Sequence, residues 1–309
     1  MNPYIVFIFS LFTIIYGSNL VVNNSKQIAI KFNISKLIIG VTIIAFGTSF
    51  PELIVGILSS IENKGDIALS NVVGSNIANL GLVLGILAFI KPITIKPNKK
   101  ISFNLISCFI ATISLISLLY FYNGVSLIGG YLLLILFLIY MYFLFSNYSR
   151  DGSFLKSKNK KFSFLYILKL FLGFALLAFG AEFFISSIVG ISSQLGFEDN
   201  IVISMSLVAL GTSIPELVTS LVAVFKKEEG LAIGNIIGSN IFNILLVVGI
   251  SSIVNPITVN FILIKYHLLL MFIVTIFFIS SIYLVKRINR VLSSIFICIY
   301  FVFLYINFS

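Results

Sequence analysis

Long apolar segments constrain this chain more than any other feature of its sequence. Ten of them recur along the 309 residues, separated by short polar linkers. Each has roughly the 20 residues with which an α-helix crosses the ~30 Å hydrocarbon core of a bilayer. Only 10% of the residues are charged, against about 25% in a soluble domain. The sequence therefore predicts an all-α membrane protein with ten transmembrane helices, at roughly residues 3–22, 36–60, 67–90, 102–121, 124–146, 163–187, 200–225, 231–254, 263–285 and 289–308.

The basic residues predict how these helices are oriented. The net charge of +10 arises mainly from lysines and arginines in the linkers, so we interpret it as a topology signal and expect no nucleic-acid partner. Loops after odd-numbered segments hold seventeen of the twenty, and loops after even-numbered segments hold only Lys64. Basic loops stay in the cytoplasm. We therefore expect a multi-pass protein of the cell membrane, with both termini extracellular and the basic loop at residues 148–162 cytoplasmic.

Two motifs occur twice, at one constant offset. Gly47–Leu53 reads GTSFPEL and recurs 164 residues later at Gly211–Leu217 as GTSIPEL. At the same offset, Ser70–Leu80 (SNVVGSNIANL) recurs at Gly234–Ile244 (GNIIGSNIFNI). The chain thus contains two copies of one internal repeat.

The repeat divides the chain into a first half at residues 1–147, the linker at 148–162 and a second half at 163–309. Each half holds five predicted helices, and an odd number of helices forces the two copies into opposite orientations. Inverted repeats are typical of secondary transporters, whose binding site lies near the membrane midplane where the repeats meet.

The first motif puts a glutamate directly after a helix-breaking proline. Pro51 has no N–H, so its helix loses the hydrogen bond to the carbonyl of Gly47. Lipid offers the freed backbone oxygens no partner. Thr48 and Glu52 are four residues apart and share a helix face, with Ser49 beside them. The second copy repeats this arrangement with Gly211, Thr212, Ser213, Pro215 and Glu216.

Two interpretations of this motif are open. An intramembrane carboxylate is by default part of a functional site. The alternative is a structural proline kink whose carboxylate bonds a neighbouring helix. One copy alone leaves that alternative open, but two copies in inverted halves favour the functional site.

The second motif predicts a polar stripe on one helix face in each half. Its residues are spaced i, i+4, i+8: Asn71, Ser75 and Asn79, then Asn235, Ser239 and Asn243. Such stripes also serve as hydrogen-bonding glue between helices, with glycines allowing close approach. We expect both roles. The outer Asn71 and Asn235 bond freed backbone groups, while the other four side chains reach an ion.

The candidate ligands are all oxygen atoms: two carboxylates, hydroxyls, amides and backbone carbonyls. Ca²⁺ takes about 6–8 such oxygens, and Na⁺ is close to it in size. Softer metals would recruit sulfur or imidazole, whereas Cys108, Cys298 and His267 lie singly in apolar segments. Two glutamates carry the formal charge that neutralises one Ca²⁺ or two Na⁺.

These motifs resemble the sodium/calcium exchanger branch of the cation/calcium exchanger superfamily, in its prokaryotic form. The resemblance covers essentially the whole chain. It implies a non-enzymatic antiporter without a cofactor that exchanges Na⁺ for Ca²⁺ across the bilayer by alternating access. The two repeat glutamates of that family bind both ions in competition. The resemblance extends the ion site to Glu52, Glu216, the threonines Thr48 and Thr212, the serines Ser49, Ser213, Ser75 and Ser239, and the backbone carbonyls of Ala45 and Ala209.

One position departs from many relatives. Prokaryotic and potassium-dependent relatives often have Asp where this chain has Asn243, and the equivalent Asn79 is also neutral. The resemblance thus implies exchange without K⁺, and a monomer is compatible with it. Three alternatives stay open on the residues alone: a cation/proton (Ca²⁺/H⁺) antiporter that protonates the same glutamates, a passive cation channel, and a scaffold that transports nothing. The last would leave both repeated carboxylates unexplained.

Overall fold

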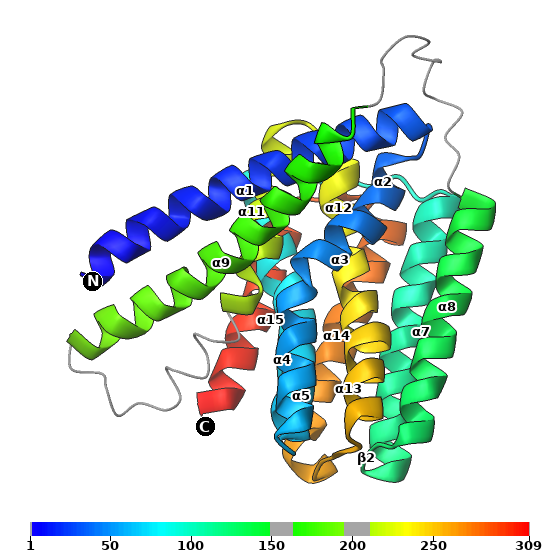
Figure 1. The fold of residues 1–309 in the computed structure, drawn as a ribbon. Helices are drawn as coiled ribbons and strands as arrows, with labels where there is room; N and C mark the ends of the chain where they lie inside the picture. The colour runs from blue at the N-terminus through cyan, green and yellow to red at the C-terminus, as the bar shows by residue number, and fades with distance from the viewer. Residues whose placement is uncertain (1, 149–162, 195–210, 309) are drawn as a thin grey trace.

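Helices make up nearly all of the chain that the computed structural model describes, which is residues 2–148, 163–194 and 211–308 (Figure 1). Before the linker they are α1 (Pro3–Phe32), α2 (Lys36–Ile39), η1 (Gly40–Ile44), α3 (Ala45–Thr48), α4 (Phe50–Ile61), α5 (Gly65–Ala78), η2 (Asn79–Val83), α6 (Leu84–Ile90), α7 (Lys99–Tyr122) and α8 (Leu127–Tyr148). After it they are α9 (Leu165–Gln194), α11 (Ile214–Phe225), α12 (Glu229–Ile241), η3 (Phe242–Val248), α13 (Gly249–Val254), α14 (Phe261–Leu284) and α15 (Arg290–Phe308). The η segments are π-helical turns that run on directly from their neighbours.

The described helices are those of a multi-pass membrane protein. Seven are long and apolar enough to cross a bilayer, or eight when the bent pair Lys36–Thr48 and Phe50–Ile61 counts as one span. Two shorter apolar helices, Ile214–Phe225 and Arg290–Ile306, fall within the seventh and tenth predicted segments. The prediction of an all-α membrane protein is confirmed. Residues 200–210, which begin the seventh segment, lie outside the described residues.

Helix α1 is longer than predicted. The sequence analysis ended it near residue 22, where its apolar run stops, but the helix continues to Phe32. No glycine or proline interrupts the polar stretch that follows, and Asn33 ends the helix in the left-handed conformation at φ 55°. Lys26 and Lys31 therefore lie on its last turns instead of in a loop.

Two long helices, α1 and α9, lie side by side and cross the rest of the bundle obliquely (Figure 1). Gly17 and Gly173 let their backbones approach closely. A Cβ on Gly17 would lie 2.9 Å from the carbonyl oxygen of Gly173, and one on Gly173 would lie 3.0 Å from that of Gly17. Small residues allow such backbone approach between helices in lipid, where no hydrophobic force drives helix association.

The two helices that carry the second motif form the centre of the molecule. Within their most apolar windows, 78% of the residues are buried in Gly65–Ile90 and 83% in Glu229–Val254, against 22% in Leu165–Ile191. The outer helices therefore shield the polar stripe from lipid.

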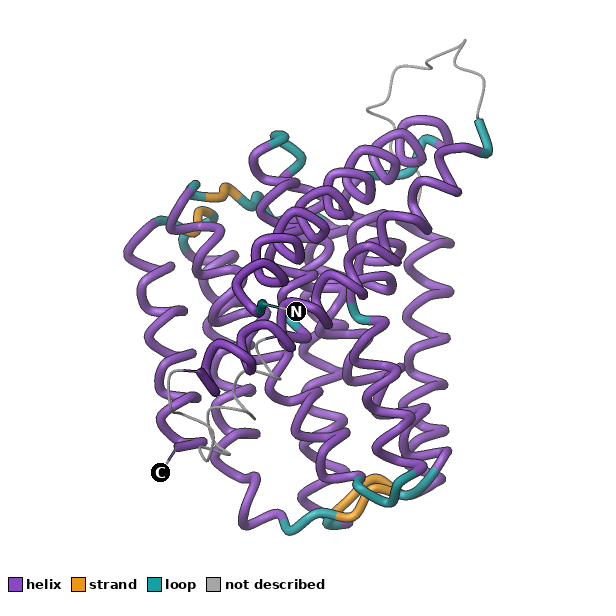
Figure 2. The backbone as a smooth tube through the Cα atoms, turned by 60° about the vertical axis from the view of Figure 1, so that its left-hand side comes forward, coloured by secondary structure: helices purple, strands orange, loops and turns teal. Residues whose placement is uncertain are grey.

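Two short antiparallel strand pairs close opposite ends of the bundle (Figure 2). At one end β1 (Ile93–Thr94) pairs with β4 (Arg287–Ile288). At the other, β2 (Gly124–Val125) pairs with β3 (Ile257–Thr258). Each pair thus joins a strand from before the linker to one from after it.

Ion pairs gather at the β1–β4 end, which we call the basic end. Glu228 precedes α12 and is only 4% exposed in its side chain. It binds Lys26 of α1 at 2.8 Å and Lys36 of α2 at 2.6 Å. The neighbouring Glu229 pairs with Lys91 at 3.1 Å, and both of those side chains are more than a third exposed. Glu228 therefore joins three helices, whereas Glu229 makes an ordinary surface pair.

We expect Glu228→Gln to destabilise the protein because it leaves two lysines around a buried neutral group. Hydrogen bonds to charged groups contribute about 1.5–3 kcal/mol, whereas an exposed pair contributes about 0–1 kcal/mol. Thermal unfolding in detergent should show a clearly lower midpoint for Glu228→Gln and little change for the matched control Glu229→Gln. Equal shifts in the two variants would contradict this account.

Candidate cation-binding site

The first motif breaks its helix where the proline predicts. The helix stops at Thr48 and restarts at Phe50, with a bend of 45° between Lys36–Thr48 and Phe50–Ile61. Ser49 occupies the break at φ −85°, ψ 8°. Ser213 has nearly the same conformation, φ −87°, ψ 0°, directly before α11. Pro51 and its counterpart Pro215 stand in the first turn of the restarted helices, where no N–H is needed.

Helix α12 approaches the first broken helix closely enough to place both motifs in contact. A Cβ on Gly234 would lie 2.4 Å from the carbonyl oxygen of Leu37, and one on Gly238 would lie 2.5 Å from that of Val41. Only glycine permits this approach. It brings the α12 residues Asn235 and Ser239 up to Thr48 on α3.

Glu52 and Glu216 are both fully buried. They belong to one cluster, because Ser49, three residues before Glu52, donates a hydrogen bond to Glu216 at 3.1 Å. Neither oxygen of Glu52 has a hydrogen-bond partner among the described residues. The ion pairs among the described residues involve other glutamates. Within the described part of the chain, neither carboxylate is therefore paired with a lysine or arginine.

Glu216 is held by hydroxyls from both sides of the linker. Its Oε1 accepts hydrogen bonds from Ser49 at 3.1 Å and from Ser239 at 3.3 Å. Its Oε2 has no partner among the described residues. Ser49 thus reaches from the break in the first helix to the glutamate of the second, and Oε2 remains available to a ligand.

The outer asparagines hold the threonines that end each broken helix. Thr48 donates to Asn235 Oδ1 at 3.0 Å, and Thr212 donates to Asn71 Oδ1 at 3.4 Å. Asn235 also donates to the carbonyl oxygen of Glu216 at 3.5 Å. The sequence analysis expected both asparagines to bond freed backbone groups. Instead, both accept hydrogen bonds from threonine side chains, and only Asn235 also bonds a backbone oxygen, at a longer distance.

The inner asparagines keep buried polar atoms without partners. Asn243 is fully buried, and neither its Oδ1 nor its Nδ2 has a hydrogen-bond partner among the described residues. Asn79 donates to Asn240 at 3.2 Å, but its Oδ1 has no partner. Ser213 Oγ, at the second helix break, is also without one. Buried polar atoms are rarely left unsatisfied, so a ligand is the natural partner of this set.

Of the remaining predicted ligands, the structure describes Ser75 and Ala45 but not Ala209. Ser75 is fully buried and lies 3.5 Å from the hydroxyl of Thr212. The carbonyl oxygen of Ala45 accepts a hydrogen bond from Thr48 Oγ1 at 3.3 Å. Ala209 lies outside the described residues. The contacts given above join two groups of predicted residues: Thr48, Ser49, Glu216, Asn235 and Ser239 in one, and Asn71, Ser75 and Thr212 in the other. Glu52 and Ser49 lie on the same break, three residues apart, and Glu216 lies four residues after Thr212.

Two features of the site could not be read from the sequence. The π-helical turns η1, η2 and η3 fall within or beside the motifs, with η2 beginning at Asn79 and η3 containing Asn243. Such turns are frequent at functional sites, but they leave no periodic pattern in the residues. Ser18 of α1 also contacts Thr219 of α11 at 3.3 Å. This pair had no counterpart at the repeat offset that could have revealed it.

Comparison with known proteins decides the family. The family model described as "Sodium/calcium exchanger protein" matches residues 2–146 and 165–309. The chain belongs to the sodium/calcium exchanger family. It is 37% identical over 238 residues to an uncharacterized membrane protein of Methanocaldococcus jannaschii, covering 77% of each chain. It is 29% identical over 304 residues to the sodium/calcium exchanger MaX1 of Methanosarcina acetivorans, covering 83% of this chain and 84% of that one.

A solved exchanger shares the fold. The sodium-calcium exchanger NCX_Mj, soaked with 10 mM Na⁺ and zero Ca²⁺, matches with a TM-score of 0.85 at 31% identity and covers 97% of both chains. The same exchanger soaked with Sr²⁺ and Na⁺ matches with a TM-score of 0.84. The resemblance inferred from the motifs is therefore confirmed. The chain described here belongs to a family of cation transporters whose substrates include calcium.

In this exchanger Glu52 should control the response to Ca²⁺. The uncharged variant Glu52→Gln removes one of two buried like charges, so we expect it to unfold at the same or a higher temperature without Ca²⁺. Ca²⁺ at about 100 times its dissociation constant would stabilise the wild type by about 2.7 kcal/mol, and the variant should lose that stabilisation. Thermal unfolding of purified protein with and without Ca²⁺ measures both effects.

The matched control is Glu62→Gln, which neutralises an exposed glutamate on the same broken helix run. It should retain the full Ca²⁺ response. A Glu52→Gln protein that is stabilised by Ca²⁺ as strongly as the control would remove Glu52 from the site.

Proposed function

We propose that this chain exchanges Na⁺ for Ca²⁺ across the membrane by alternating access, with the ions bound between Glu52 and Glu216. One observation carries the proposal: buried oxygens from both sides of the linker have no hydrogen-bond partner within the described part of the chain. They belong to Glu52, Glu216, Asn79, Asn243 and Ser213. Carboxylate, amide and hydroxyl oxygens are the ligands that hard cations prefer. The family supports calcium as one substrate and Na⁺ as the other.

We further propose that the chain forms ten transmembrane helices in two inverted halves, residues 1–147 and 163–309, joined by the basic loop at 148–162. The strand pairs support an inverted arrangement. β1 and β3 are equivalent at the repeat offset, yet they lie at opposite ends of the bundle (Figure 2). A two-fold axis in the membrane plane would produce this exchange of ends. The family match, which also divides near the loop, supports the same boundaries.

The distribution of charge supports one orientation of the proposed fold. Lys26, Lys36 and Lys91 form their ion pairs at the basic end, beside β1. Lys64 precedes α5, whose first residue Gly65 packs against β3 at the other end. By the positive-inside rule the basic end faces the cytoplasm. Both termini would then be extracellular, in a monomer within the cell membrane.

The ion cycle follows from the charge of the site. The glutamates carry two negative charges, so either one Ca²⁺ or Na⁺ ions neutralise them and the two substrates compete. Switching between sides would occur only when the charges are neutralised, because a bare buried pair is costly to move. With three Na⁺ for each Ca²⁺, one net charge crosses, worth about 2.3 kcal/mol per 100 mV.

The pair α1 and α9 is the candidate moving part. It crosses the other helices obliquely (Figure 1) and holds itself together through Gly17 and Gly173. Its polar contacts to the inner helices include Ser18 with Thr219 and Lys26 with Glu228. Sliding of α1 and α9 as one unit would break few polar contacts while exposing the site to the other side.

Transport in proteoliposomes tests the proposed function. An outward Na⁺ gradient should drive ⁴⁵Ca²⁺ uptake by the wild type, and both Glu52→Gln and Glu216→Gln should reduce it to background. Glu62→Gln should transport as the wild type does. Wild-type-like uptake by both site variants would refute the proposal.

The same vesicles separate the antiporter from its rivals. A pH gradient without Na⁺ should not drive uptake, since Ca²⁺ accumulation under that condition would identify a Ca²⁺/H⁺ antiporter. Flux that needs no counter-ion would identify a channel.

Exchange should also be independent of K⁺. Asn79 and Asn243 are neutral, so the site has no third carboxylate to balance a further cation. Replacing all K⁺ by choline should leave Na⁺-driven Ca²⁺ uptake unchanged. In Asn243→Asp, the added charge should alter the dependence of uptake on monovalent cations. Asn76→Asp is the comparison variant. It places a charge one turn before Asn79, in the half before the linker, and so tests the effect of a charge at a different position. A wild-type rate that falls to background without K⁺ would contradict this prediction.

A further inference from the structure

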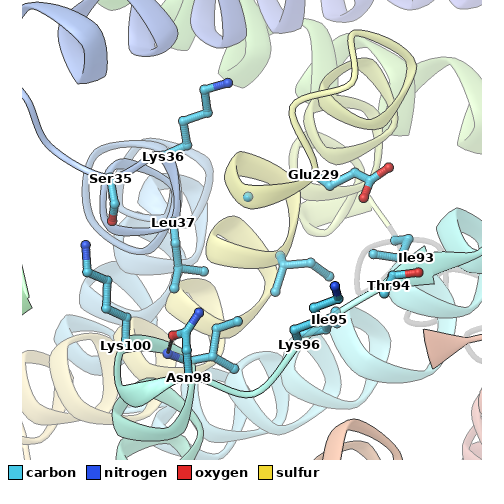
Figure 3. Close-up of a pocket in the computed structure, with 13 residues that line it drawn as sticks. Ser35, Lys36, Leu37, Ile93, Thr94, Ile95, Lys96, Asn98, Lys100 and Glu229 are labelled. Atoms are coloured by element: carbon cyan, nitrogen blue, oxygen red, sulfur yellow. Dashed lines mark hydrogen bonds between the residues drawn. The ribbon is translucent and has the colours of Figure 1, made fainter. Parts of the chain in front are cut away.

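A pocket of about 560 Å³ opens at the basic end, and neither Glu52 nor Glu216 lines it (Figure 3). Three elements form it: the start of α2, the start of α12, and the connection from β1 into α7. Its polar lining consists of Ser35, Lys36, Thr94, Lys96, Asn98, Lys100 and Glu229. The proposed ion exchange uses none of these residues.

The charge around this pocket is positive. Lys36, Lys96 and Lys100 line it, and the lining carboxylate, Glu229, is already paired with Lys91 at 3.1 Å. The adjacent Glu228 is shared between Lys36 and Lys26. These five lysines outnumber the two glutamates by three charges. A site of this sign repels Ca²⁺ and Na⁺, so the pocket does not belong to their entry path.

Two helix N-termini add to the positive potential. α7 begins at Lys99, where Asn98 caps the amide of Ile101 at 2.9 Å, and α12 begins at Glu229. Asn98 and Gly230 both line the pocket. The aligned peptide dipoles place partial positive charge at each N-terminus, which favours a bound anion. The lysines and the helix ends therefore both favour an anion in this one open pocket.

The position of the pocket indicates the source of the anion. The pocket lies where helices α2, α7 and α12 begin, at the basic end, which the orientation proposed above places at the level of the cytoplasmic lipid headgroups. Basic pockets between transmembrane helices on the cytoplasmic side bind the phosphates of anionic lipids. Apolar side chains, Leu37, Ile95 and Ile101, complete the lining and suit the glycerol and upper acyl carbons.

We propose that this pocket binds the phosphate group of an anionic membrane lipid. The lipid would join α2, which leads into the first broken helix, to α12, which carries Asn235 and Ser239. It would also hold the β1–α7 connection against both. Lipid bound there would stabilise the packing on which the ion site depends, without touching the ions.

Thermal unfolding of the purified, delipidated full-length protein in detergent tests this inference without measuring transport. The probes are phosphatidylglycerol, phosphatidylcholine and inorganic pyrophosphate. We expect phosphatidylglycerol to raise the unfolding midpoint and phosphatidylcholine to leave it unchanged. The double variant Lys96→Gln/Lys100→Gln should need roughly thirtyfold more phosphatidylglycerol for the same rise, because each lysine near the surface contributes about fivefold in binding.

The matched control is Lys99→Gln/Lys227→Gln, which removes two charges at the same end from residues that do not line the pocket. It should respond as the wild type does, and Lys96→Arg/Lys100→Arg should retain the response. Equal responses of the glutamine pocket variant and its control would overturn the proposal. So would a rise with pyrophosphate but none with phosphatidylglycerol, since the ligand would then be a soluble phosphate.

Discussion

Two buried carboxylates without a counter-ion among the described residues are the constraint on which this structure depends. Glu52 and Glu216 are both fully buried, and no described lysine or arginine is paired with either. A charge buried without a partner costs several kcal/mol, and inside a membrane it marks a functional site. A bound cation would remove that cost, which is why we propose the transported ions as the partners of these two glutamates.

The surrounding architecture follows from this requirement. Proline breaks bring each glutamate to the start of a helix, and glycines on α12 let the two motifs meet. Ser49 reaches across from one motif to the glutamate of the other. The most buried helices carry the polar stripe, while α1 and α9 cross outside them (Figure 1).

Much of this was predictable from the sequence because it rests on strong local rules. The length of the apolar segments predicted the helices, and Pro51 and Pro215 predicted the breaks. The internal repeat indicated that Glu52 and Glu216 are equivalent residues of one site. The motifs also identified the family, which the comparisons confirmed. The long-range hydrogen bonds were not predictable. That Asn235 accepts from Thr48, for example, depends on the angle and depth of helix packing, which the spacing of residues within one helix does not contain.

The errors have physical causes of the same kind. Apolar periodicity ended α1 near residue 22, but the helix reaches Phe32 because its continuation packs against the protein, with Asn24, Ser25, Ile28 and Ala29 buried. The π-helical turns at Asn79 and around Asn243 are wider than α-helical turns and form only where tertiary contacts stabilise them. Both features depend on what lies beside the helix, which local sequence patterns do not report.

Locating the bound ion tests the central claim most directly. Crystals of this protein grown without divalent ions and soaked in Ca²⁺ should show one new density peak, about 2.3–2.6 Å from carboxylate oxygens of both Glu52 and Glu216. Na⁺ soaking should displace it, and Glu52→Gln crystals should lack it. A Ca²⁺ peak bound to only one glutamate, or one that persists unchanged in the variant, would contradict the account.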